Sequence, residues 1–251
     1  MWKIANPTVF LALASRIMPW LIAVTALLFA IGLYGAVISP DDYQQGATVK
    51  IMYIHVPFAW LAMAGWTVMS LSAIGTLVWR HPLAEVAMKA AAPIGAAFTF
   101  LCLVTGSLWG RPMWGTWWVW DARLTSVLVL FIMYLGVMAL WRTVEDPGRA
   151  AKIVAVLVLV GAVNIPIIKF SVEWWNTLHQ GASVLRMGGS TIDKSMLWPL
   201  LTMALAFTLL FFVLHLLAMS NEILRRRIRT MRLMAASATP APAAPIRPVE
   251  A

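Results

Sequence analysis

Six long apolar stretches dominate the sequence and restrict the fold more than any other feature. A helix needs about 20 apolar residues to cross the hydrocarbon core of a bilayer, because each residue adds about 1.5 Å of rise. Six stretches approach that length, at roughly 19–38, 52–79, 87–108, 124–141, 153–170 and 197–219. None alternates apolar and polar residues as a barrel strand would. The sequence therefore predicts an all-α fold: a polytopic integral membrane protein built as a six-transmembrane-helix bundle.

The composition agrees with lipid as the solvent. Hydrophobic residues make up 61% of the chain and charged residues only 12%, whereas a soluble domain carries about a quarter charged residues. A chain with so few polar residues cannot form the polar surface that a folded protein needs in water. The formal net charge of +9 is therefore interpreted as a topology signal and not as a nucleic-acid surface, because the basic residues cluster between and beyond the apolar stretches.

The distribution of Lys and Arg predicts the orientation. If the N-terminus is cytoplasmic, about two-thirds of the 19 Lys and Arg residues fall on the cytoplasmic side, with the strongest cluster at 225–232. We expect both termini to be cytoplasmic and residues 1–18 to form a retained segment at the membrane surface. Residues 1–232 are expected to form the membrane domain, and the Ala/Pro-rich residues 233–251 a disordered cytoplasmic tail.

This orientation places the segments 39–51, 109–123 and 171–196 on the outer side. The sequence contains no Walker motif or other phosphate-binding glycine loop, so the chain is not expected to hydrolyse ATP itself. The single cysteine, Cys102, excludes an internal disulfide and any covalent haem attachment through a pair of cysteines. Function is therefore expected to reside in the outer segments.

The segment 109–123 contains five of the chain's 14 tryptophans. An aromatic belt at the headgroup layer is the ordinary explanation for interfacial tryptophan, but a belt places only one or two rings at each helix end. We interpret the segment as an apolar platform that can stack against a planar macrocycle and leave the edges of the ligand in water.

Three charged residues accompany the tryptophans. Arg111 and Arg123 can meet anionic groups such as haem propionates through charge-assisted hydrogen bonds, although interfacial solvation explains either residue equally well. Asp121 suits the N-cap position of the fourth span, and it can also orient the platform.

Two of the four histidines are expected at the depth of this segment. His55 begins the second span and His179 lies in the third outer segment. A neutral imidazole is a common ligand of haem iron, and a bis-histidine site needs one imidazole from each side of the macrocycle. A lone interfacial histidine is usually solvated or hydrogen-bonded, and we keep that interpretation for His81 and His215.

These outer segments resemble those of the haem-handling proteins of bacterial cytochrome c maturation, specifically the CcmC (haem exporter protein C) family. The run Trp-Gly-Thr-Trp-Trp-Val-Trp-Asp at 114–121 is similar to the tryptophan-rich WWD motif of that superfamily. The His-Val-Pro block at 55–57 and the Trp-Trp-Asn-Thr-Leu-His block at 174–179 are similar to its two histidine motifs. The resemblance covers residues 19–220 and includes the six spans.

The resemblance implies a role in haem delivery and not an enzyme. Proteins of this family bind haem b non-covalently and transiently at the periplasmic face of the bacterial inner membrane, and pass it to the haem chaperone CcmE. They associate with the ABC transporter subunits CcmA and CcmB and with the small membrane protein CcmD, within membrane lipid. By position, the resemblance makes His55 and His179 the axial iron ligands. It assigns the platform to Trp114, Trp117, Trp118, Trp120 and Asp121.

Two other functions remain open at this point. A membrane cytochrome b-type electron-transfer subunit would carry histidine pairs within the membrane, whereas here only His215 lies well inside a span. A cytochrome c haem lyase component would form thioether bonds, and the larger WWD relatives with that role have additional spans and histidines.

Overall fold

The computed structural model describes residues 6–181, 183–184 and 186–238. Within these residues the chain forms seven α-helices and one short 3-10 helix, η1. In chain order the elements are α1 (Pro7–Ile38), η1 (Ala47–Ile51), α2 (Met52–Val78), α3 (Pro82–Trp114), α4 (Ala122–Thr143), α5 (Pro147–Gly161), α6 (Asn164–Trp174) and α7 (Lys194–Ala238).

Six segments of this helical structure are long and apolar enough to cross a membrane. The predicted all-helical, six-span architecture is thereby confirmed. Five spans are continuous helices, with η1 leading into α2, and the fifth span consists of α5 followed by α6. The break lies four residues before Pro166, which has no amide hydrogen to donate to the Ala162 carbonyl. That carbonyl instead accepts from Ile165 N at 3.1 Å.

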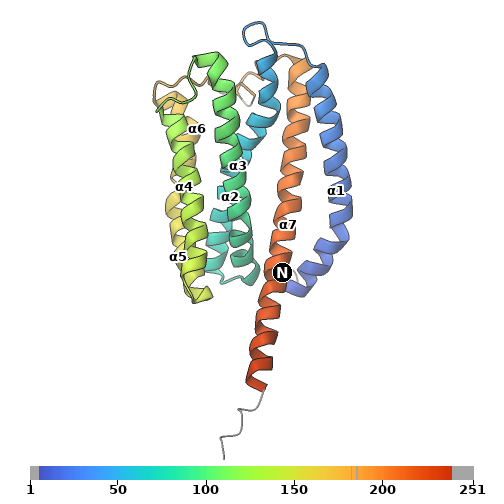
Figure 1. Ribbon diagram of the computed structural model, residues 1–251, viewed down its shortest axis with the longest axis vertical. Helices are drawn as coiled ribbons and strands as arrows, with labels where there is room; N and C mark the ends of the chain where they lie inside the picture. The colour runs from blue at the N-terminus through green and yellow to red at the C-terminus, as the bar shows by residue number, and fades with distance from the viewer. Residues whose placement is uncertain (1–5, 182, 185, 239–251) are drawn as a thin grey trace, which may run out of the picture.

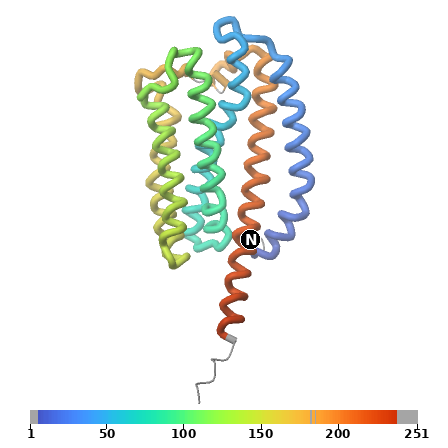
Figure 2. The backbone as a smooth tube through the Cα atoms, in the orientation of Figure 1, coloured from blue at the N-terminus to red at the C-terminus, as the bar shows by residue number. Residues whose placement is uncertain are grey.

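The helices are arranged around a central pair, α2 and α3, which pack along much of their length (Figure 1). On one side α7 contacts this pair, and α1 packs on α7. On the other side lie α4, α5 and α6, and Figure 2 shows the same grouping. The α1–α7 contact depends on small residues, since a Cβ at Gly32 would lie 2.7 Å from Met203 Sδ and a Cβ at Gly35 would collide with the ring of Trp198.

Two aromatic residues occupy the centre of the bundle. Trp66 of α2 and Tyr134 of α4 are fully buried and meet edge to face at 4.9 Å between ring centroids. Each ring satisfies its polar atom on a neighbouring backbone: Trp66 Nε1 donates to Val158 O at 3.0 Å, and Tyr134 Oη donates to Ala62 O at 2.8 Å. In an apolar environment such bonds are needed because an unpaired polar group is costly.

The start of α1 and the end of α7 lie at the same end of the bundle (Figure 1). Near this end Glu222 of α7 is buried and accepts from Lys89 Nζ of α3 at 2.7 Å and from Arg226 Nε at 2.9 Å. Arg226 also donates to Glu85 at 2.7 Å. This network joins α3 to α7. The opposite end of the bundle carries the connections 39–51, 115–121 and 175–193.

Three helix limits differ from the sequence prediction. Residues 7–18 are helical and continuous with the first span, because α1 begins at Pro7 and its first turn is capped by Asn6. Helix α3 continues to Trp114 and shortens the expected loop 109–123. Helix α7 continues to Ala238, so residues 233–238 of the expected tail are helical, because no Gly or Pro interrupts the chain between Pro199 and Pro240. Residues 239–251 lie outside the described part of the chain.

Candidate functional site

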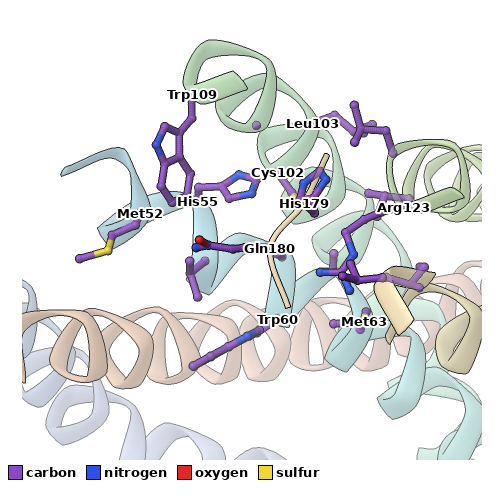
Figure 3. A pocket seen from close by; sticks show the side chains of 18 of the residues that line it. Met52, His55, Trp60, Met63, Cys102, Leu103, Trp109, Arg123, His179 and Gln180 are labelled. Carbon is purple, nitrogen blue, oxygen red and sulfur yellow. The ribbon is translucent and has the colours of Figure 1, made fainter. Parts of the chain in front are cut away.

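A cavity of about 280 Å³ opens into the bundle at the end that carries these three connections. Its walls come from α2, α3, α4, α6 and the segment that follows α6. His55 and His179, which are far apart in the sequence, both line this cavity, and Figure 3 shows the two imidazole rings near each other within it. The predicted grouping of the two outer histidines at one depth is therefore present in the fold.

His55 lies one turn inside α2 and is held by α3. Its Nδ1 lies 3.0 Å from the hydroxyl of Thr105. The ring meets Trp109 edge to face, with 5.7 Å between centroids. Gly106 leaves room for the ring, because a Cβ at this position would lie only 3.0 Å from His55 Cε1.

His179 lies in the connection between α6 and α7. Its ring contacts Trp114 at 4.9 Å between centroids. Its Nδ1 lies 3.8 Å from Asp121 Oδ2, which is longer than a hydrogen bond and makes the contact electrostatic. Burial, reinforced by the positive charge of Arg123, lowers the pKa of His179 to about 4, although Asp121 opposes the shift. The imidazole is therefore neutral at physiological pH, which is the form that binds a metal.

Asp121 connects two segments of the site. Its Oδ1 accepts from Leu124 N at 2.8 Å and caps α4, as the sequence predicts for this position. Its Oδ2 faces the segment after α6. There it accepts a hydrogen bond from Leu178 N at 3.4 Å and lies 3.8 Å from His179 Nδ1. The carboxylate is buried, so one side chain fixes the start of α4 and faces the back of the His179 ring.

Arg123 lines the cavity and is anchored to α6. Its Nε donates to Ser171 Oγ at 3.0 Å and its Nη2 donates to Lys169 O at 3.3 Å. A guanidinium has five N–H donors, so donors remain for an anionic ligand. Arg111 does not line the cavity. It donates to the Gly115 carbonyl and lies over the ring of Trp117, with 5.9 Å from Cζ to the centroid.

The structure divides the tryptophans of the segment 109–123 between the cavity and the surface. Trp114 and Trp118 line the cavity together with Trp109. Trp117 and Trp120 do not line it and are 56% and 75% exposed. The division arises because α3 continues to Trp114 and ends at Gly115, whose positive φ of 73° turns the chain.

Several residues of the site were not singled out from the sequence. Thr105 and Gly106 belong to the last turns of α3, and Gly106, Trp60 and Gln180 line the cavity. Thr105 and Gly106 already fall within the predicted span 87–108, but the sequence did not show that this face of the helix meets His55. His81 and His215 lie away from the cavity: His81 precedes α3, and His215 is buried in α7 against Phe211.

These residues fit a haem group chemically. Two imidazoles, four indoles and one guanidinium meet the needs of an iron centre, a planar apolar macrocycle and its anionic edge. Two buried polar atoms at the site, Trp118 Nε1 and His179 Nδ1, have no hydrogen-bond partner among the residues that the structure describes. Buried polar groups are normally paired, so Trp118 Nε1 can donate to a polar ligand, whereas His179 Nδ1 faces Asp121.

Comparisons with known proteins show the family of the chain. The family model described as "Heme exporter protein C" (CcmC) matches residues 1–234. The chain belongs to the haem exporter protein C family. The protein of that name from Bradyrhizobium diazoefficiens is 73% identical over 234 residues, which cover 93% of this chain and 89% of the relative. Those from Paracoccus denitrificans and Escherichia coli K12 are each 46% identical, and the alignments cover 92% and 89% of this chain and 96% and 92% of the relatives.

The family assignment gives the chain a general role. It is a multi-pass membrane protein of haem export in cytochrome c biogenesis. The matched residues contain five spans, the sixth up to residue 234, and every residue that lines the cavity. The resemblance expected from the WWD segment and the two histidine blocks is thereby confirmed.

Proposed function

We propose that the chain binds haem b non-covalently and transiently, with His55 and His179 as axial ligands of the iron. One observation carries this proposal: two histidines from segments far apart in the sequence line a single cavity whose walls include Trp109, Trp114 and Trp118. His55 comes from a helix and His179 from a connection, so the two rings can approach a macrocycle from different directions. The neutral state of His179 favours metal binding.

The remaining site residues have separate roles in this proposal. Trp114 and Trp118 stack against the macrocycle, and Arg123 binds a propionate through the donors that α6 leaves free. Asp121 orients His179 from behind. Trp117, Trp120 and Arg111 lie outside the cavity, where they are placed to meet the edge of the bound haem or the protein that receives it.

We propose that the cavity faces the periplasm and that both termini are cytoplasmic. The support is the charge distribution: the cluster 225–232 belongs to α7 at the end of the bundle opposite the cavity, and basic residues favour the cytoplasmic side. In the bacterial inner membrane this orientation presents haem to the chaperone CcmE. The chain would then act with the ABC transporter subunits CcmA and CcmB and with CcmD, which supply the ATPase and complete the complex, and would itself be a haem-delivery protein and not an enzyme.

Absorption spectroscopy of the purified chain tests the ligand assignment. Haem-loaded protein is expected to show a low-spin, bis-histidine spectrum, and His55→Ala and His179→Ala are each expected to lose it. His81→Ala is the matched control, because His81 lies outside the cavity, and its spectrum should equal that of the unchanged protein. A bis-histidine spectrum that survives in both outer-histidine variants would refute the assignment.

A further inference from the structure

Three residues in the last turns of α3 surround the His55 ring. Thr105 reaches Nδ1 with its hydroxyl at 3.0 Å, Trp109 presents its ring at 5.7 Å between centroids, and Gly106 leaves the space that Cε1 occupies. The orientation of His55 is thus set by α3, although the residue itself belongs to α2.

The hydroxyl of Thr105 also bonds to the backbone of its own helix. Its Oγ1 lies 2.7 Å from Leu101 O and 3.3 Å from Cys102 O. A hydroxyl has one hydrogen to donate and two lone pairs that accept. Because the short contact with Leu101 O uses the hydrogen, the oxygen can only accept from His55. The contact at 3.0 Å therefore requires the hydrogen of the neutral ring to be on Nδ1.

A hydrogen on Nδ1 leaves the lone pair of Nε2 free. In metal sites the hydrogen bond made by one ring nitrogen decides which nitrogen binds the metal and also raises the basicity of the ligand. The opposite tautomer would require the Thr105 hydroxyl to turn away from Leu101 O and would place a hydrogen on Nε2, which then could not bind iron.

We infer that Thr105 is a positioning residue for haem binding: with the Leu101 carbonyl behind it, its hydroxyl fixes the His55 tautomer that presents Nε2 to the iron. This inference rests on the proposed axial role of His55. His179 has no such bond, since its Nδ1 is 3.8 Å from Asp121 Oδ2 and has no hydrogen-bond partner among the described residues. The two histidines are therefore held differently, one by a direct hydrogen bond and one by a carboxylate at longer range.

The test compares Thr105→Val, which keeps the shape and removes the hydroxyl, with Thr105→Ser, which restores it. Loss of such an outer partner typically weakens a metal site about 10- to 100-fold. Haem dissociation from Thr105→Val is therefore expected to be faster by about that factor, with the loss of part of the low-spin ferric EPR signal. The haem reduction potential should become more positive, because a less basic imidazole stabilises the ferric state less. Thr105→Ser should return all three measurements toward those of the unchanged protein.

Thr99→Val is the matched control. Thr99 belongs to the same helix, and its hydroxyl donates to Gly95 O at 2.7 Å in the same way, but it lies six residues before Thr105 and makes no hydrogen bond to His55 among the residues that the structure describes. If Thr99→Val and Thr105→Val gave the same EPR signal, dissociation rate and potential, the inference would be overturned. If Thr105→Val did not accumulate in the membrane, Thr105→Ala would carry the test. It also removes the hydroxyl that contacts His55 Nδ1, and unchanged haem binding in this variant would equally overturn the inference.

The same experiment separates this inference from the proposed function. If the unchanged protein lacks a bis-histidine signal, or keeps it after His55→Ala, the axial assignment fails and the role of Thr105 fails with it. If His55→Ala loses the signal while Thr105→Val retains every property of the unchanged protein, only the positioning role of Thr105 is wrong.

Discussion

Asp121 offers the sharpest test of how the site is built, because its two carboxylate oxygens do different things. Oδ1 caps α4 through Leu124 N at 2.8 Å, and Oδ2 lies 3.8 Å behind His179 Nδ1. Asp121→Asn keeps a good N-cap and removes the charge, whereas Asp121→Ala removes both. Comparison of the two variants therefore separates the stability of the helix from the electrostatic support of His179.

The expected magnitudes follow from these contacts. Loss of an N-cap costs about 1 kcal/mol, and Asn caps about as well as Asp. The free energy of unfolding should thus fall by about 1 kcal/mol in Asp121→Ala and hardly change in Asp121→Asn. Loss of an outer-sphere carboxylate weakens a metal site by about 10- to 100-fold. Both variants should therefore bind haem more weakly, by about 1.4 to 2.8 kcal/mol.

The assay combines haem titration followed by absorption with thermal unfolding of the purified protein in detergent. Asp146 provides a matched control, because its Oδ1 accepts from Arg149 N at 2.6 Å and caps α5, away from the cavity. Asp146→Ala should lose a similar cap energy and bind haem normally. The reasoning would be refuted if Asp121→Asn bound haem like the unchanged protein, or if only Asp121→Ala bound it more weakly, since Asp121 would then act through the helix alone.

Three further predictions concern stability, the cavity wall and pH. Glu222→Ala should lower the free energy of unfolding by about 3 kcal/mol, because it breaks a buried ion pair whose carboxylate is 8% exposed. The side chain of Arg225 is 77% exposed, so Arg225→Ala should leave the melting temperature unchanged. Trp114→Ala should weaken haem binding by about 0.5 to 1.5 kcal/mol through loss of its ring contacts. Haem titration of Trp20→Ala should match the unchanged protein, because this tryptophan of α1 is 76% exposed and does not line the cavity. Because the folded pKa of His179 is lowered to about 4, the unfolded chain takes up a proton below about pH 6.5 that the folded chain does not. The contribution of His179 to the free energy of unfolding is thus fully present above the unfolded pKa and falls by about 2 kcal/mol between pH 7.5 and 5. The free energy of unfolding of His179→Gln, measured at both pH values, should lack this contribution. A pH dependence equal to that of the unchanged protein would contradict the prediction.

The sequence alone determined the architecture of the membrane domain. Lipid offers no hydrogen-bonding partner to the backbone, so each apolar stretch must satisfy its own amides and carbonyls as a helix. For the same reason the ends of the stretches predicted which residues share a depth. His55, the segment 109–123 and His179 were expected at one end of the bundle, and the structure brings both histidines and part of that segment to one cavity there. The N-cap position of Asp121 was also predictable, because it depends only on the residues next to it.

The tertiary structure alone decided which of these side chains face one another. The continuation of α3 to Trp114 and the turn at Gly115 direct Trp114 and Trp118 into the cavity and leave Trp117 and Trp120 exposed. The pairing of Thr105 with His55 depends on the relative rotation of α2 and α3. Sequence patterns record periodicity within one element, whereas the rotation of one helix against another is set by packing of side chains from both. The sequence therefore predicted the two histidines and part of the tryptophan set that line the cavity, and it did not predict the contacts that hold them in place.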